Sequence, residues 1–238
     1  MSSRRVLVVQ HEDRVPLGRL DLHGVDVDVV RPDRGDPLPD RLTDHDGLVV
    51  LGGRVAAWED DVAPWLPATR DLLARAVADD VPVLGVCLGA QLLALATGGS
   101  VRRGAAGSET GVVEVTATPD AADDALVGGL GPSWLAAQSH RDAVTALPGG
   151  AVLLAGSAAY PHQAFRLGRA AWGVQYHPEV TLEVLADWLR DQQDVLALRG
   201  RTVHEVLAEA EAADERLAAL AAAHGQAFAR VVAERAAA

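Results

Sequence analysis

The 238-residue sequence contains no lysine, so all 21 of its basic residues are arginine. Chemistry that depends on a lysine side chain is therefore excluded, including the P-loop type of phosphate binding, Schiff-base catalysis and the covalent attachment of pyridoxal phosphate. Asparagine is also missing, which removes every acceptor for N-linked glycans.

The chain has a single cysteine, Cys87, which excludes an internal disulfide and a cysteine-rich zinc site. An unpaired thiol survives best in a reducing compartment, so we expect a cytoplasmic protein. The histidines outside the motifs described below are scattered without the spacing of metal ligands. We expect no metal and no cofactor.

Positive charge is scarce as well, because 33 acidic residues outweigh the arginines and leave a formal net charge of −12. Nucleic acids and anionic membranes are bound through clustered positive charge, so neither is an expected partner. The longest apolar stretch, residues 81–96, is interrupted by Pro82 and Gln91 and does not predict a membrane span. Small molecules and proteins are the expected partners.

The pattern along the chain predicts an α/β fold with a doubly wound, mostly parallel sheet and an antiparallel extension. Apolar runs that suit buried parallel strands alternate with two helical patterns, at 64–80 and 88–97, in the first half. The second half is richer in strand patterns. The predicted strands cover residues 5–9, 25–30, 47–51, 81–86, 111–118, 134–139, 151–155, 163–167 and 171–176. Only a weak helix is expected within 11–23.

From residue 181 onward the sequence is rich in alanine, glutamate, arginine and leucine and has no strand signal. We expect one helix over 181–198, a break at Gly200, and a second helix opened by a capping box of Thr202 and Glu205. Gly225 is a candidate for a further break. The predicted organisation is an enzyme domain over 1–188 and a helical C-terminal extension over 189–238, packed on or beside that domain.

Cys87 lies in the run Gly85-Val-Cys-Leu-Gly89, where an apolar segment stops and a helical pattern begins. This arrangement is typical of a nucleophile elbow, a sharp turn from strand to helix that needs small residues where the two segments pass. The free N–H groups at the start of the helix favour the thiolate. The sequence therefore predicts that Cys87 is a nucleophile.

A cysteine nucleophile needs a base, and the run Gly173-Val-Gln-Tyr-His-Pro-Glu179 offers His177 and Glu179 at the end of a predicted strand. Residues two apart on a strand face the same way, so we expect these two side chains to lie side by side. His177 would accept the thiol proton while Glu179 orients the imidazole. A Cys-His-Glu triad is the prediction.

These motifs resemble those of the class I glutamine amidotransferases, also called triad glutaminases. The resemblance rests on four blocks in order, 48–53, 85–91, 138–142 and 175–179, and spans about residues 4 to 188. It points to a stand-alone member similar to the amidotransferase domain of GMP synthase. The resemblance implies a flavodoxin-like fold and glutamine as substrate. It also implies a γ-glutamyl thioester, and ammonia delivered to a synthase or to an unidentified acceptor.

The resemblance also implies further site residues. The oxyanion hole would consist of the backbone N–H groups of Gly53 and Leu88. The family often has proline after the two glycines, whereas this chain has Arg54. The residues that match the family's substrate-binding positions are Gly52, Gln91, Gln138, Ser139 and His140. A competing interpretation of His140 is a polar loop histidine without a role in the reaction.

Two other functions remain open at this point. The same triad would serve a γ-glutamyl hydrolase, which transfers the acyl group only to water. Alternatively, the chain is a catalytically weak binding or regulatory module of the same fold. Candidate protein partners are a second copy of the chain and a synthase subunit.

Overall fold

The computed structural model describes residues 4–235. Nine strands form one sheet in the order β2-β1-β3-β4-β11-β10-β9-β6-β7, and β5 and β8 form a small second sheet. The strands are β1 Arg4–Val9, β2 Val25–Val30, β3 Gly47–Val50, β4 Val83–Val86, β5 Ser100–Arg103, β6 Glu109–Ala117, β7 Ser133–His140, β8 Asp142–Ala146, β9 Val152–Gly156, β10 Ala164–Leu167 and β11 Ala171–Val174. The helices are α1 Leu66–Ala78, α2 Leu88–Ala96, α3 Leu182–Asp191, α4 Gln193–Ala197, α5 Val203–Ala212 and α6 Asp214–Arg235.

The large sheet has a parallel half and an antiparallel half. Strands β2, β1, β3, β4 and β11 pair in parallel, whereas β10, β9, β6 and β7 pair antiparallel. The predicted α/β class, with a mostly parallel sheet and an antiparallel extension, is confirmed.

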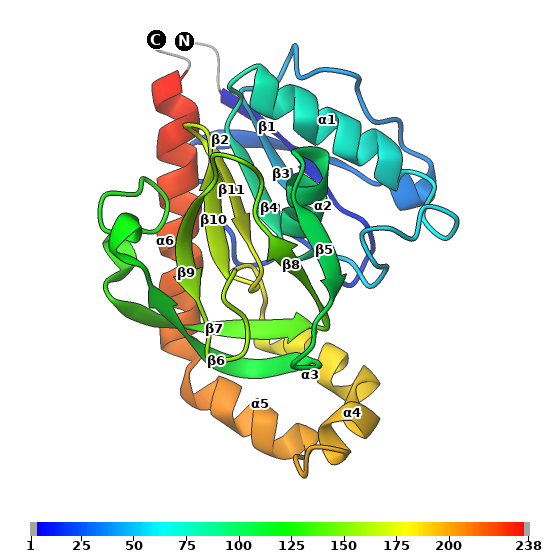
Figure 1. Ribbon diagram of the computed structural model, residues 1–238, viewed down its shortest axis with the longest axis vertical. Coiled ribbons are helices and arrows are strands. Elements are labelled where there is room, and N and C mark those ends of the chain that lie inside the picture. The colour runs from blue at the N-terminus through cyan, green and yellow to red at the C-terminus, as the bar shows by residue number, and fades with distance from the viewer. Residues whose placement is uncertain (1–3, 236–238) are drawn as a thin grey trace.

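Helices cover both faces of the parallel half, as the apolar runs of β3 and β4 predict. Successive residues of β1 point to opposite faces, so Val6 belongs to the same buried cluster as Phe228 of α6, and Leu7 to the same cluster as Leu72 of α1. Figure 1 shows α6 along one side of the sheet, α1 and α2 on the other, and α5 below β6 and β7. The carboxyl ends of the parallel strands are thereby left free for a site.

The C-terminal helices differ from the expectation in two places. The prediction of one helix over 181–198 is wrong, because the chain leaves the helical conformation at Gln192 between α3 and α4. Gly225, the candidate for a further break, lies inside α6, and the second helix is divided instead at Ala213, between α5 and α6. A Cβ at Gly225 would lie 2.1 Å from the carbonyl oxygen of Asp21, so this glycine permits a close approach of the chain. The capping box of Thr202 and Glu205 is confirmed.

The helical extension packs on the sheet. Phe228 and Val232 of α6 are fully buried in the cluster that also covers β1 and β3. The expected boundary at residue 188 falls inside α3, whose Leu185 and Leu189 are buried in that cluster as well. Within residues 4–235, every helix is too short or too polar to cross a bilayer.

Two further differences concern short segments. Residues 11–23 form turns instead of the weak helix that the sequence suggested, and Arg19 N–H donates to the carbonyl of Glu179 at 2.8 Å. Strands β5 and β8 were not predicted, because β5 carries two exposed arginines and β8 has only two buried residues.

Candidate active site

Cys87 lies at the sharp turn between β4 and α2, with φ +49° and ψ −104°. A non-glycine residue rarely adopts a positive φ, and such strain is typical of a nucleophile elbow. A Cβ at Gly89 would lie 1.9 Å from the carbonyl oxygen of Val50, and one at Gly85 would lie 2.6 Å from the backbone of Gly89. Both glycines are therefore required by close backbone approach, as the sequence predicted.

His177 and Glu179 form a buried pair, in which His177 Nδ1 lies 2.7 Å from Glu179 Oε1. Their side chains are 3% and 1% exposed. The two side chains lie side by side, as predicted. The expectation that they share one face of a strand is wrong, because β11 ends at Val174 and both residues lie in the turn that follows. The contact fixes the proton on Nδ1, and Nε2 is a buried atom without a hydrogen-bond partner among the described residues.

Gly52 marks the point where the cysteine and the histidine meet. A Cβ at this position would lie 3.0 Å from His177 Cε1 and 3.6 Å from Cys87 Cβ. The indole of Trp188 packs edge-on against the imidazole with 4.7 Å between ring centroids, and its Nε1 donates to the Arg14 carbonyl at 3.0 Å. The imidazole is thus held between Glu179, Trp188 and the Gly52 turn.

The electrostatics of the pair favour a charged imidazole. Burial alone would lower the pKa of His177, but the negative charges of Glu179 and Cys87 outweigh it and raise that pKa from 6.5 to about 10. The buried site therefore carries a positive charge on His177 close to Cys87.

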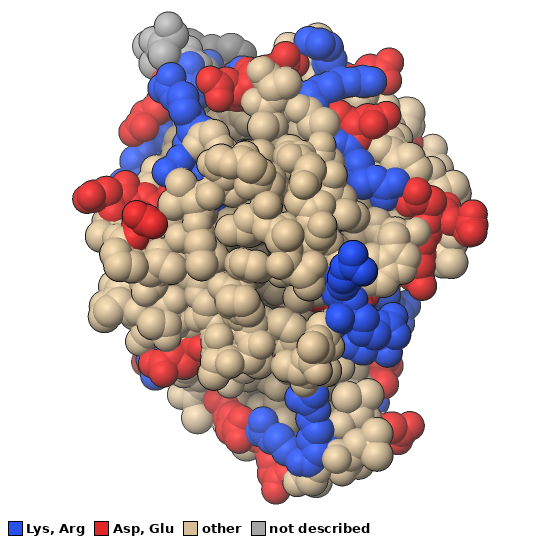
Figure 2. Space-filling model, viewed as in Figure 1, with Lys and Arg blue, Asp and Glu red and all other residues tan. Residues whose placement is uncertain are grey.

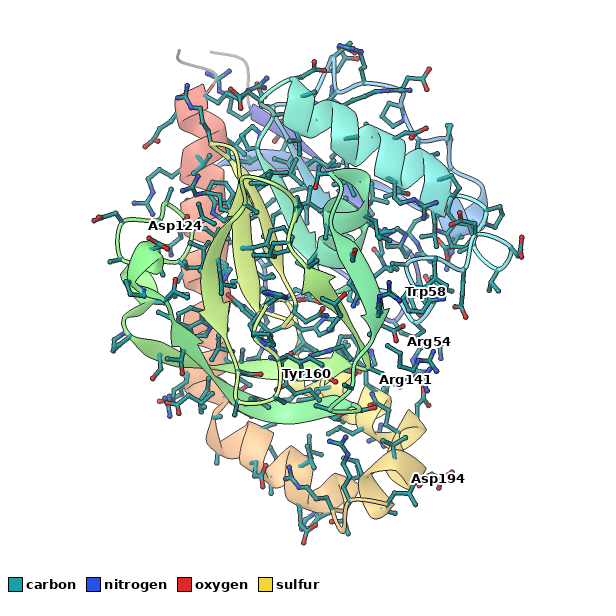
Figure 3. All side chains as sticks on the ribbon, viewed as in Figure 1. Arg54, Trp58, Asp124, Arg141, Tyr160 and Asp194 are labelled. Carbon is teal, nitrogen blue, oxygen red and sulfur yellow. The ribbon has the colours of Figure 1, made fainter. Side chains whose placement is uncertain are left out.

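The sulfur faces a cavity of about 350 Å³. Its wall is built from the β3 and β4 ends, the β7–β8 corner and the α3–α4 junction. The lining residues are Val15, Gly53, Arg54, Val55, Cys87, Gln91, Ser108, Ser139, His140, Arg141, Asp142, His177, Trp188, Asp191, Gln192 and Val195. Figure 2 shows arginine atoms gathered on the right of this face, the side on which Figure 3 labels Arg54 and Arg141 close together.

Gln91 and His140 of the predicted set lie on the cavity wall and share one acceptor. Gln91 Nε2 donates to the Asp142 carbonyl at 2.9 Å, and His140 Nδ1 lies 3.1 Å from the same oxygen. His140 Nε2 lies 3.0 Å from Glu109 Oε2, so both ring nitrogens face acceptors. His140 ends β7 and its side chain is 1% exposed, so it is not a polar loop histidine.

The other members of the predicted set occupy different positions. Ser139 lies on the wall and accepts from Gln192 Nε2 at 2.8 Å. Gln138 is fully buried and donates to Gln163 Oε1 at 2.9 Å, so its side chain belongs to the core behind the wall.

Of the two residues expected as oxyanion donors, one begins α2 and the other lines the cavity. Leu88 is the first residue of α2, and the N–H groups of a helix's first turn have no partner within the helix. Gly53 lines the cavity just after β3. Arg54, which follows it, is held by Glu12, whose Oε1 accepts from the Arg54 N–H at 2.7 Å and whose Oε2 accepts from Arg54 Nε at 2.9 Å.

Sequence reasoning missed the contribution of the C-terminal helices to the site. Gln192 bridges Ser139 and Thr110, accepting from the Thr110 hydroxyl at 3.0 Å. Asp191 pairs with Arg14 at 2.5 Å and with Arg54 at 3.5 Å. The polar run Asp191-Gln-Gln-Asp194, within an otherwise amphipathic helical pattern, was the available signal that the helix is interrupted there.

Residues 17–193 match the family model Glutamine amidotransferase class-I. The chain belongs to this family. It is 40% identical over 161 residues to a glutamine-hydrolyzing GMP synthase subunit of Halobacterium salinarum, covering 67% of this chain and 78% of the relative. The corresponding subunit of Natronomonas pharaonis is 36% identical over 179 residues, or 75% of this chain and 89% of the relative.

Solved amidotransferase structures match a longer part of the chain than the family model does. A glutamine amidotransferase from Thermotoga maritima superimposes with a TM-score of 0.84 at 28% identity, covering 98% of this chain and 99% of its own. A glutamine amido transferase from Methylobacillus flagellatus gives a TM-score of 0.79 at 29% identity, covering 96% and 94%. Helices α5 and α6 have 10 and 22 residues, so coverage of 98% necessarily includes most of them.

Proposed function

We propose that the protein is a glutaminase that hydrolyses the side-chain amide of glutamine through Cys87, His177 and Glu179. The observation that carries the proposal is the buried His177–Glu179 pair, which meets the strained Cys87 elbow at Gly52. Family membership supports this substrate class, since the relatives are named as glutamine-hydrolysing subunits.

The reaction follows from the charges. The thiolate of Cys87 attacks the side-chain carbonyl carbon of glutamine and forms a tetrahedral intermediate. His177 Nε2 donates its proton to the departing amide nitrogen, which leaves as ammonia while the γ-glutamyl thioester remains. His177 then takes a proton from water, the resulting hydroxide attacks the thioester, and glutamate departs. Glu179 keeps the imidazole oriented in both steps.

Backbone groups would stabilise the tetrahedral oxyanion. The N–H of Leu88 opens α2, and the N–H of Gly53 is on a loop held by the Arg54–Glu12 contacts. Each correctly aimed donor contributes roughly 10²- to 10³-fold to the rate. Glu12 thus restrains this loop at Arg54, the position where the family often has proline.

The substrate's charged end fits the β7–β8 corner. Arg141 lines the cavity and is exposed, while the neighbouring Asp142 carboxylate is paired with Arg103 at 3.3 Å. The Arg141 guanidinium can therefore donate hydrogen bonds to the substrate's carboxylate. Gln91 uses its amide nitrogen within the protein, which leaves its carbonyl oxygen to accept from the substrate. Ser139 and His140 complete this wall.

The ammonia would serve a synthase partner. Relatives named as glutamine-hydrolyzing subunits of GMP synthase support a partner of that kind. The test is glutamate release from glutamine by the purified chain, alone and with candidate synthases, together with labelling by a glutamine-mimicking electrophile. Labelling that is lost in Cys87→Ala supports the proposal, whereas no labelling even with a partner supports a binding module.

A γ-glutamyl hydrolase is the second candidate. Its support is the cavity, whose volume of about 350 Å³ lies in the range of pockets for ligands larger than an amino acid, with Asp191, Gln192 and Val195 adding a wall beyond the triad. Turnover of glutamine measured against γ-glutamyl amides and peptides separates the two. A higher kcat/KM for the peptides would overturn the glutaminase proposal.

A further inference from the structure

Gln175 directly precedes the catalytic turn, and its side chain reaches the nucleophile. Its Nε2 lies 3.5 Å from Cys87 Sγ, and the residue is only 2% exposed. We propose that Gln175 is a further catalytic residue, whose amide N–H donates to the Cys87 sulfur and holds it as the thiolate. The inference rests on the proposed function in that it assigns Cys87 the role of nucleophile.

The direction of this hydrogen bond follows from its neighbours. The Asp142 carbonyl can only accept, so the Gln91 atom 2.9 Å from it must be the amide nitrogen. That nitrogen also lies 3.2 Å from the Gln175 side chain, which must therefore present its oxygen to Gln91. The remaining Gln175 atom, the one that faces the sulfur, is then the nitrogen. A backbone carbonyl thus decides that the sulfur accepts.

The Asp142 carbonyl, which fixes the orientation of Gln91, is itself held in place. The same Asp142 carbonyl is held by His140 Nδ1 at 3.1 Å, and His140 is held by Glu109 at 3.0 Å. Glu109 accepts in addition from Ser157 and from Gln163, both at 2.6 Å. The Gln175 backbone is fixed too, because its N–H donates to the Gln163 carbonyl at 2.9 Å.

The chemistry of a sulfur atom gives this contact its effect. A thiol accepts only weakly, whereas a hydrogen bond to a charged acceptor is about twice as strong as a neutral one, and more so away from water. The amide therefore stabilises the thiolate over the thiol. It does so from another direction than His177, which must give up its proton to the leaving group, so Gln175 supports the anion without taking part in the proton transfer.

The experiment is the rate of Cys87 alkylation by iodoacetamide as a function of pH, which requires no glutamine turnover. Gln175→Met removes the donor, and we expect the alkylation midpoint to rise by roughly one pH unit, a tenfold loss of thiolate below the midpoint. Gln175→Glu keeps the shape and the acceptor for Gln91 but places a negative charge beside the sulfur. We expect a larger rise for this variant.

A purely structural role predicts the opposite order, because Gln175→Glu preserves the contact with Gln91 and Gln175→Met does not. A midpoint that stays unchanged in Gln175→Glu, or that rises less than in Gln175→Met, overturns the proposal. If Gln175→Met does not fold, as judged by circular dichroism, the test is the alkylation midpoint of Gln175→Glu compared with that of the wild type. Thr69→Val, which removes an equally buried hydrogen-bond donor on α1 outside this network, is the control and should leave the midpoint where it is.

The outcome is independent of the glutaminase assay. A raised midpoint with no glutamine turnover in any variant supports the role of Gln175 and refutes the proposed substrate. An unchanged midpoint in the Gln175 variants, in a protein that turns glutamine over, refutes the role of Gln175 and leaves the proposed substrate standing.

Discussion

Glu179→Gln is the change that tests the ion pair most directly, because it removes one charge and leaves the volume almost unchanged. In the wild type, the Glu179 carboxylate lies 2.7 Å from His177 Nδ1, with both side chains buried. Without the carboxylate, burial lowers the His177 pKa and only Cys87 still opposes that effect. We therefore expect the imidazole of the variant to lose its proton at a lower pH than that of the wild type.

The size of the effect on stability follows from linkage. The His177 pKa is raised in the folded state, so its contribution is complete below the unfolded pKa of 6.5 and is lost as pH rises toward about 10. At about 1.4 kcal/mol per pKa unit, the shift of His177 sets an upper bound of roughly 5 kcal/mol on the effect of Glu179, because Cys87 contributes part of that shift. In the variant most of this pH-dependent contribution is absent. The effect on turnover is expected to be about 10³- to 10⁴-fold in kcat.

The assay is urea unfolding of the wild type and the variant at several pH values between 6.5 and 10. Groups that titrate alike in both proteins cancel, so the difference between the two curves reports how Glu179 acts on His177 and on its neighbour Cys87. We expect the wild type to lose several kcal/mol more than Glu179→Gln across the range. Parallel curves would refute the reasoning, because they would mean that Glu179 does not hold a proton on His177.

Three further changes test other parts of the structure. Gly52→Ala places a Cβ 3.0 Å from His177 Cε1, so we expect kcat to fall by roughly 10²-fold, whereas Gly149→Ala, where no atom lies within 4 Å, should match the wild type. Equal kinetics for the two variants would contradict the role of Gly52. Gln192→Ala removes the contact with Ser139, and we expect KM for glutamine to rise by about tenfold with little change in kcat; a fall in kcat alone would argue against a binding role. Phe228→Ala empties a fully buried position on α6 and should cost about 3–5 kcal/mol in one cooperative unfolding transition, whereas a separate early transition would indicate that the helical extension folds as its own unit.

The parts of the molecule that the sequence predicted well are those decided by short-range chemistry. The elbow at Cys87 follows from the glycines around it, and Gly89 is required because any Cβ would strike the Val50 carbonyl. The buried strands of the parallel half follow from apolar runs that have no polar face. The capping box of Thr202 and Glu205 is complete within four residues. In each case the residues that carry the prediction lie within a few positions of one another in the chain, although the Val50 carbonyl that requires Gly89 does not.

The errors have a common physical origin in tertiary contacts. Helical periodicity continues through residue 192, yet the chain breaks there, where the Gln192 side chain contacts Ser139 and Thr110 on two strands far away in the sequence. Gly225 indicates a helix end by propensity, but α6 continues because the glycine lies against the Asp21 backbone. Local propensity was overridden in both places by contacts with distant segments.

The direction of the hydrogen bonds in the site could not be predicted from the sequence. Gln175 is part of a motif that the sequence makes obvious, yet nothing in that motif says whether its amide offers nitrogen or oxygen to Cys87. That choice is made by the Asp142 carbonyl through Gln91, so it depends on three segments that only the folded chain brings together. Motifs of this kind therefore identify which side chains meet, whereas the direction of the hydrogen bonds between them is set by segments that only folding brings together.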